Sequence, residues 1–198
     1  MEKGNSDTGH HKVLYIKNMV CPRCIKVVRD ELTALGLHVV TVALGQAVVA
    51  ETGEAQEAAI EAALRHNGFE LLRNKRQELV EKVKLTVLDL IYQGKLPLLK
   101  TTVATYLAEE LGKDYSSIST TFKALEGVAL NRYVVLQKIS RARELLEYDE
   151  LSIGEIAGSL GYSSPQHLSS QFKEVTGLTP LAYKKRAHLP RKPIDNLY

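Results

Sequence analysis

The sequence predicts an α+β protein of two domains, a small domain of strands and helices followed by an all-α domain. Three observations lead to this prediction. Strand-like and helix-like patterns alternate over the first part of the chain. A pattern of residue types that begins at Phe122 recurs at Phe172. The chain has 2 cysteines, Cys21 and Cys24, and both lie between the first predicted strand and the first predicted helix.

The first domain, residues 12–73, has the order β-α-β-β-α-β. Strands are indicated by alternating or Val-rich runs, and helices by an apolar stripe that ends at a glycine. The predicted elements are a strand at 12–18, a helix at 22–35, strands at 39–44 and 47–50 around a Gly45-Gln46 hairpin, a helix at 54–66 and a strand at 69–72. This order is typical of a ferredoxin-like sandwich, in which two helices cover one face of a four-stranded antiparallel sheet.

The cysteine pair lies at the start of the first predicted helix. The positive helix end and its unpaired amides favour thiolates, and soft thiolates select Cu(I), Zn(II) or similar ions. The motif Met19-x-Cys21-x-x-Cys24, with the fold order, resembles the heavy-metal-associated domain of copper chaperones and metal-pumping ATPases. The resemblance implies a metal site at this motif, with Cys21 and Cys24 as ligands and Met19 packed beneath the loop.

Three interpretations of the pair stay open at this point: a metal-binding or metal-sensing site, a reversible disulfide switch, and two inert thiols. A thioredoxin-type oxidoreductase is disfavoured because the strand order differs and the chain has no Trp. A tetrahedral zinc site would need further ligands from a partner chain or from histidines such as His10, His11 and His66.

The second domain, residues 76–187, contains the repeated pattern. In its second copy Ser152 and Glu155 have the spacing of a capping box, and Gly161 permits a tight turn. Ser164 and Pro165 then start another helix, as N-cap and first helical residue. Two helices joined by a short turn that contains Gly are the usual scaffold for placing one helix in a DNA groove.

A helical wheel separates a buried face from a polar face in both copies. Leu168, Phe172 and Val175 form the predicted buried face of the second copy, and Ile118, Phe122 and Leu125 form that of the first. Short polar side chains on the opposite face can approach base edges and phosphates. The residues expected to contact DNA are Ser116, Ser117, Ser119, Thr120 and Lys123 in the first copy and Gln166, His167, Ser169, Ser170 and Lys173 in the second. The alternative is an ordinary solvated face, which duplication of the whole unit disfavours.

The second domain resembles the DNA-binding domain of the AraC family of bacterial transcription regulators. The matching motif is Gly161-Tyr162-Ser-Ser, Leu168, Phe172-Lys173, Gly177, Thr179-Pro180 and Tyr183. The resemblance implies seven helices, with two helix-turn-helix units joined by a long helix at 130–148, and both recognition helices in successive major grooves. These grooves recur every ~34 Å, and a helix of about nineteen residues rises ~28 Å. On the first recognition helix, family members often have a bulky side chain or an Arg that contacts bases, whereas this chain has only Ser and Thr there.

Charge is consistent with a DNA partner for the second domain. Up to Asn74 the chain carries 8 Lys/Arg and 9 Asp/Glu, a net charge of −1, and the remainder carries 18 and 14, a net charge of +4. Basic side chains that neutralise phosphates release counterions and so drive binding. The residues expected to contact phosphates are Lys138, Arg141, Lys184, Lys185 and Arg186.

Composition predicts a cytoplasmic protein without a membrane partner. No apolar run approaches the ~20 residues that span a bilayer, and the start of the chain is polar rather than a signal peptide. A reducing cytoplasm agrees with free thiols.

The predicted function is sequence-specific DNA binding by a transcription regulator that responds to a soft metal ion at Cys21 and Cys24. One alternative is a thiol/disulfide redox-responsive regulator. The other is a metal-buffering or transfer protein whose helical domain binds a partner. An enzyme is not expected, because no Ser-His-Asp arrangement, phosphate-cradling Gly loop or paired carboxylates are found. Double-stranded DNA is the predicted partner, with RNA polymerase and a second copy of the chain as further candidates.

Overall fold

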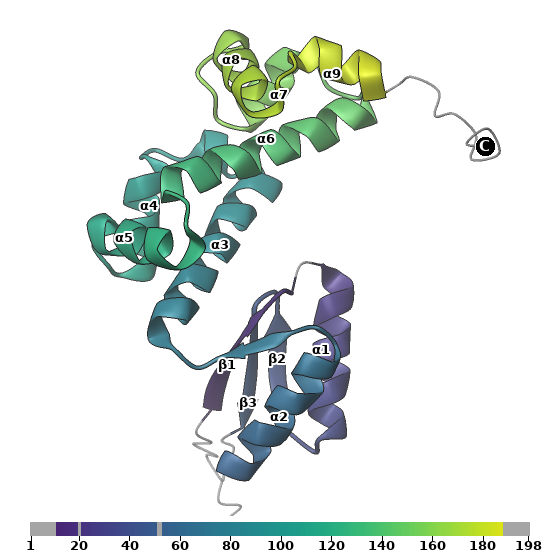
Figure 1. Ribbon diagram of the computed structural model, residues 1–198, viewed down its shortest axis with the longest axis vertical. Coiled ribbons are helices and arrows are strands. Elements are labelled where there is room, and N and C mark those ends of the chain that lie inside the picture. The colour runs from purple at the N-terminus through teal and green to yellow at the C-terminus, as the bar shows by residue number, and fades with distance from the viewer. Residues whose placement is uncertain (1–10, 20, 51–52, 188–198) are drawn as a thin grey trace, which may run out of the picture. The chain divides into compact units, whose positions relative to one another are not determined.

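The computed structural model describes residues 11–19, 21–50 and 53–187 (Figure 1). The chain divides into two compact units, Met1–Leu85 and Thr86–Tyr198. The division falls inside helix α3 (Lys75–Tyr92), which begins where the sequence predicts the second domain to start. No helix in the described ranges has the length and apolar character that crossing a bilayer requires.

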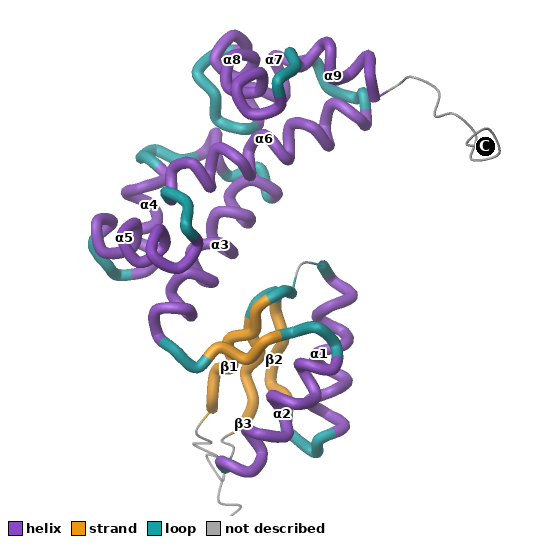
Figure 2. Tube along the Cα trace, in the orientation of Figure 1, coloured by secondary structure: helices purple, strands orange, loops and turns teal. Residues whose placement is uncertain are grey.

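The first unit contains all the described strands (Figure 2). Its elements are β1 (His11–Lys17), α1 (Pro22–Ala34), β2 (Val39–Ala43), β3 (Gln46–Ala50), α2 (Glu54–His66) and β4 (Glu70–Leu72), followed by the first part of α3. The strands form one sheet in the order β2-β3-β1-β4, and all its pairings are antiparallel.

Both helices α1 and α2 cover the same face of this sheet. Leu14 and Ile16 of β1 share one buried core with Leu32 of α1 and Leu64 of α2. The strand alternation explains this packing, because Leu14 and Ile16 are two residues apart and point to the same face. This packing holds α1 against the sheet, and α1 begins directly after the cysteine loop.

The β2–β3 hairpin differs slightly from the predicted one. Its turn residues are Leu44 and Gly45, because Gln46 already pairs with Ala43 as the first residue of β3. Gly45 has a φ of +76°, and a Cβ at this position would collide with the Leu85 side chain. The glycine is thus required both by the turn and by the close approach of α3.

Within the described residues, the regular secondary structure of the second unit is helical. After α3 come the 3₁₀ turn η1 (Leu96–Leu98) and the helices α4 (Val103–Leu111), α5 (Tyr115–Glu126), α6 (Leu130–Tyr148), α7 (Ile153–Ser159), α8 (Pro165–Thr176) and α9 (Pro180–Ala187). Helix α4 packs on α5 and α7 packs on α8, while α6 contacts both pairs. The predicted bounds of the long helix, 130–148, are confirmed.

The repeated sequence produces a repeated packing contact. Phe122 of α5 and Phe172 of α8 are both fully buried. The centroid of the Phe122 ring lies 5.1 Å from that of Tyr133, and the centroid of the Phe172 ring lies 5.5 Å from that of Tyr183. Each helix also ends at a glycine with positive φ, Gly127 and Gly177, whose N–H donates to the carbonyl of the lysine after the phenylalanine.

The wheel is wrong for Leu125, which was expected to be buried beside Phe122. Leu125 is 44% exposed. It lies in the last turn of α5, one residue before the helix ends at Glu126. Helical period gives the direction of a side chain, but it does not show how far along the helix the neighbouring element extends.

The predicted helix starts of the second copy are confirmed. Ser152 Oγ accepts from Glu155 N–H at 3.2 Å, and Glu155 Oε2 accepts from Ser152 N–H at 2.8 Å, which completes the capping box. Ser164 Oγ accepts from His167 N–H at 3.1 Å at the start of α8, and Pro165 is the first helical residue. Both helices of this pair therefore begin at residues that the local sequence specifies.

We predict that Phe172→Ala lowers the free energy of unfolding of the second unit by about 3–5 kcal/mol, because it leaves a cavity in a fully buried site. Leu125→Ala, at an exposed apolar position of α5, should cost about 1 kcal/mol or less. Urea unfolding followed by circular dichroism would measure both. If both variants lost the same free energy of unfolding, Phe172 would not be the main side chain that anchors α8 in the core.

Candidate nucleic-acid interface and cysteine pair

Helix α8 presents a polar row to solvent because its apolar residues are buried on the other side. Leu168 and Phe172 lie in the core of the second unit. The predicted DNA contacts of this helix occupy the opposite face: Gln166, His167, Ser170 and Lys173 are exposed, and Ser169 is half-buried. Short polar side chains and a lysine are able to approach base edges and phosphates.

The first turn of α8 is held in place by Tyr162. Its hydroxyl donates to Gln171 Oε1 at 2.7 Å, and its ring meets the His167 ring edge-on with centroids 5.3 Å apart. Burial raises the pKa of Tyr162 to about 12, so its hydroxyl remains a donor at neutral pH. Ser163 Oγ lies 3.2 Å from His167 Nδ1, on the other side of the turn. Together these contacts fix the His167 ring at the exposed start of α8.

Helix α5 presents the corresponding row of the first pair. Ile118 and Phe122 are buried, and the predicted DNA contacts are exposed at Ser116, Ser117, Thr120 and Lys123 and half-buried at Ser119. Its N-cap is Asp114, whose side chain makes no capping hydrogen bond. A carboxylate at this end of the helix opposes the approach of a phosphate, which the Ser164 hydroxyl at the start of α8 does not.

Helices α5 and α8 lie on different sides of α6 (Figure 1). Two neighbouring residues near the start of α6 contact them: the Tyr133 ring packs on Phe122 of α5, and Arg132 Nη1 lies 2.7 Å from Glu174 Oε1 of α8. Helix α6 therefore contacts both helices that carry the predicted DNA contacts.

Three of the five predicted phosphate contacts are engaged within the protein. Lys138 is half-buried with its Nζ 5.0 Å from the centroid of the Tyr162 ring, and burial lowers the pKa of Lys138. Arg141 Nη1 lies 2.8 Å from Glu144 Oε2, and the Arg141 guanidinium lies over the Tyr92 ring at 5.0 Å. Lys184 pairs with Asp149. Lys185 and Arg186 are exposed, and neither has a polar partner within residues 11–187 as described.

No role is predicted from the sequence for Gln171, Arg132 or Glu174, although all three contact elements that position α8. Gln171 accepts the Tyr162 hydroxyl, and the Arg132–Glu174 pair joins α6 to α8 across 42 positions of sequence. These contacts have no local periodicity. Only Tyr162 carried a signal, because it belongs to the motif that follows Gly161.

The cysteine pair lies at the N-terminus of α1, as the sequence predicts. Cys21 is the N-cap, Pro22 is the first helical residue, and the two Sγ atoms lie 3.4 Å apart as free, half-buried thiols. Hydrogen bonds from the backbone and then the side chain of Cys24 lower the pKa of Cys21, against an opposing effect of burial. Cys21 is therefore the thiol that ionises more readily than an ordinary cysteine.

Met19 is buried in the core against which Cys24 packs. It is 3% exposed and belongs to the core that Leu14 and Val28 share. His66 is exposed at the end of α2 and His11 at the start of β1, while His10 lies outside the described residues. Within those residues, no group of three or more His, Cys, Asp or Glu side chains could hold a metal ion. The donor set of this loop is two thiols, which fits a soft ion better than a tetrahedral zinc site.

Comparison with known proteins places the second unit. Residues 107–186 match a family model described as a helix-turn-helix domain. The regulatory protein PocR of Salmonella typhimurium is 35% identical over 68 residues, which cover 34% of this chain and 22% of PocR. The HTH-type transcriptional activator RhaR of Pectobacterium carotovorum is 33% identical over 70 residues, which cover 35% of this chain and 25% of RhaR. The matches thus span about a quarter of the length of these curated relatives.

Two solved structures share the fold of the helical unit. The C-terminal domain of AraT, a response regulator from Geobacillus stearothermophilus, superposes with a TM-score of 0.51 at 22% identity, covering 61% of this chain and 94% of that one. A transcriptional regulator from Chromobacterium violaceum, described by its AraC-type DNA-binding domain, gives a TM-score of 0.50 at 22% identity, covering 58% and 96%. Residues 107–186 therefore match a helix-turn-helix domain, and the helical unit has the fold of these two structures.

Proposed function

We propose that this chain is a sequence-specific DNA-binding transcription regulator. The observation that carries the proposal is the exposed polar row of α8, held on the buried Leu168 and Phe172 inside a segment that matches a helix-turn-helix model. The names of two relatives support it, because one is a regulatory protein and the other a transcriptional activator. Double-stranded DNA in the cytoplasm is the proposed partner, and RNA polymerase and a second copy of the chain are further candidates.

The pairs α4–α5 and α7–α8 act in this proposal as two helix-turn-helix units. Their second helices, α5 and α8, enter successive major grooves on one face of the duplex, and such grooves recur every ~34 Å. The two helices contribute unequally. Helix α8 offers Gln166, which suits adenine, while α5 offers Ser and Thr behind the Asp114 carboxylate. We assign base readout mainly to α8 and a smaller share of the DNA contacts to α5.

The first unit is proposed to be a ferredoxin-like domain of the heavy-metal-associated type. Its support is the β-α-β-β-α-β order, the sheet order β2-β3-β1-β4 and a cysteine pair at the start of the first helix. Cys21 and Cys24 would hold a soft ion such as Cu(I) or Zn(II), and Met19 would support the loop from the core. When bound, such an ion would supply a positive charge to the two thiolates, and the regulator would change its DNA affinity in response.

Two other functions use the same pair. A reversible disulfide is favoured by the 3.4 Å separation of the sulfurs and by the lowered pKa of Cys21. In a metal-buffering or transfer protein, the ion would be passed to a partner and the helical unit would serve recruitment. The experiments that follow distinguish these functions by their effect on DNA affinity.

Lys173→Gln is expected to weaken binding to specific and non-specific duplexes by a similar factor. Because Lys173 is exposed in the last turn of α8, loss of one phosphate contact should reduce the slope of log K against log[salt] by about 1. Lys26→Gln, which removes the same charge from the exposed face of α1, is the matched control and should leave the slope unchanged. Fluorescence anisotropy over a salt series measures both, and an unchanged slope in Lys173→Gln would remove this residue from the interface.

Gln166→Ala is expected to relax base choice at a single position of the binding site. One good bidentate contact is worth about 1–3 kcal/mol of discrimination, and the loss should appear only for duplexes that differ at that base. Binding to a library of single-substitution duplexes would locate the position. A uniform loss across the library would show that Gln166 contacts the backbone instead.

Replacing both Cys21 and Cys24 by Ser should abolish any effect of Cu(I) on DNA affinity, because hydroxyls are poor ligands for soft ions. Met19→Leu is the matched control: it keeps the core volume and should keep the response, since Met19 is buried. Titrating the metal anaerobically into protein with a fluorescent duplex measures metal binding and DNA affinity in one experiment. If the unsubstituted protein binds Cu(I) but its DNA affinity does not change, the protein is a metal buffer or transfer protein and not a metal sensor. If its DNA affinity changes when an oxidant is added without metal, the pair is a disulfide switch.

A further inference from the structure

A pocket of about 480 Å³ opens in the second unit between α6, α8 and α9. This volume lies within the ~300–1,000 Å³ typical of sites for small molecules. Its aliphatic wall is formed by Leu136 and Ile139 of α6, Val175 of α8 and Leu178 of the loop that precedes α9. Val175 lies on the side of α8 that faces away from Lys173, so the pocket is behind the polar row and not part of it.

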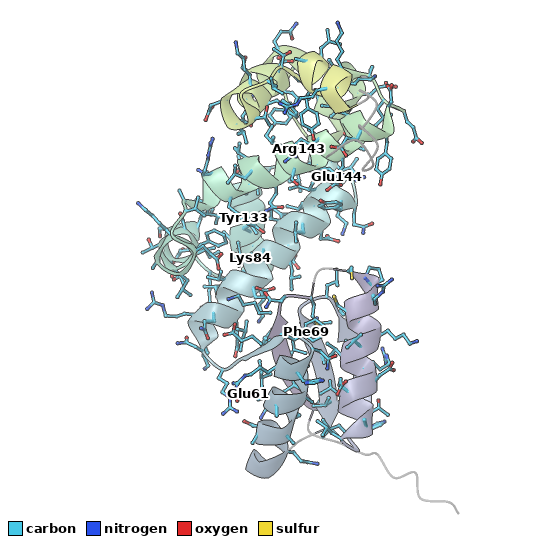
Figure 3. The ribbon with its side chains drawn as sticks, turned by 45° about the vertical axis from the view of Figure 1, so that its right-hand side comes forward. Glu61, Phe69, Lys84, Tyr133, Arg143 and Glu144 are labelled. Atoms are coloured by element: carbon cyan, nitrogen blue, oxygen red, sulfur yellow. The ribbon has the colours of Figure 1, made fainter. Side chains whose placement is uncertain are left out.

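Two guanidinium groups line the same pocket. Arg143 comes from α6 and Arg186 from α9. Arg143 lies on the side of α6 that faces the last helices, whereas the adjacent Glu144 is turned toward α3 (Figure 3). Arg143 Nε donates to Tyr183 Oη at 3.0 Å, and the guanidinium lies over the Tyr183 ring, 5.3 Å from its centroid. Within the described residues, the two terminal nitrogens of Arg143 make no hydrogen bond. Arg186 is exposed and has no partner within residues 11–187 as described.

The polar lining of the pocket is complementary to an anion. Among the described residues that line it there is no carboxylate. Glu147 accepts from the Tyr183 hydroxyl at 2.6 Å, and its charge acts on Arg143 from outside the pocket, because it is not a lining residue. The Thr176 hydroxyl is already used, because it donates to the Phe172 carbonyl at 2.8 Å. The Ser140 hydroxyl, in contrast, has no polar partner in the described part of the chain and is available to a ligand.

We propose that this pocket binds a small organic carboxylate with an apolar body, such as a medium-chain fatty acid. The carboxylate pairs with Arg143 and Arg186, and the hydrocarbon covers the wall formed by Leu136, Ile139, Val175 and Leu178. Both parts are needed. A neutral ligand leaves the guanidinium groups without a charged acceptor, and an inorganic anion leaves the aliphatic wall in water. This site goes beyond DNA binding and does not depend on it.

The test is calorimetric titration of the full chain with octanoate, octanamide and inorganic phosphate. Octanoate should bind, and the amide and phosphate should bind at least about tenfold more weakly, because each lacks one of the two interactions. Arg186→Gln should weaken octanoate binding by about tenfold. Lys185→Gln is the matched control: it removes one exposed positive charge from the adjacent position of α9, outside the pocket, and should change binding by less than about twofold. Arg143 is left intact because it also holds Tyr183.

Three results would overturn the proposal. The first is octanoate and octanamide binding equally, which would show that the charge is not recognised. The second is an equal effect of Arg186→Gln and Lys185→Gln, which would reduce the interaction to general electrostatics. The third is no octanoate binding together with weaker binding of every duplex by Arg186→Gln, which would make the guanidinium a DNA backbone contact.

Discussion

The second unit depends on one contact made twice, a buried phenylalanine beneath a tyrosine ring. Phe122 with Tyr133 and Phe172 with Tyr183 anchor the two helices that carry the polar rows. Burial of a large aromatic side chain stabilises by several kcal/mol, on the order of 3 or more, whereas an exposed polar residue changes stability by about 0.5 kcal/mol or less. The position of the rows is therefore set by residues that face away from solvent. The residues within the rows can change without cost to the fold, which suits a surface that must match a particular DNA sequence.

Local signals explain why so much of this unit could be predicted. The bounds of α6, the capping box at Ser152 and the N-cap at Ser164 depend on residues within one or two turns, and the sequence shows them directly. The failures involve contacts between distant elements. Leu125 follows the correct period but lies at the end of its helix, and Lys138 and Arg141 look like free cations until the Tyr162 and Tyr92 rings appear beside them. Charge in a sequence indicates a possible role, and only packing shows whether the charge is already paired.

This internal pairing changes the electrostatic argument for DNA binding. The net charge of +4 in the second part of the chain was spread over many basic residues, yet Lys138, Arg141 and Lys184 are engaged by rings or carboxylates. The exposed cations that remain on the two polar rows are Lys123 and Lys173, at equivalent positions in the last turns of α5 and α8. With so few phosphate contacts, the salt dependence should be shallow. In the proposed function, specificity then depends on the uncharged residues of α8, chiefly Gln166.

The cysteine loop of the first unit is constrained by the chemistry of two close thiols. Hydrogen bonds from Cys24 stabilise the thiolate of Cys21, but ionising both sulfurs at a separation of 3.4 Å places two like charges side by side. Pro22 at the first helical position lacks an N–H, so fewer amides are available to neutralise them. In the proposed function, a soft cation held by both sulfurs would neutralise this repulsion. A disulfide, formed when both thiols lose their protons and an oxidant takes up two electrons, would remove both charges. Either state would avoid the pair of thiolates, which is why the proposal assigns the response of the regulator to this loop.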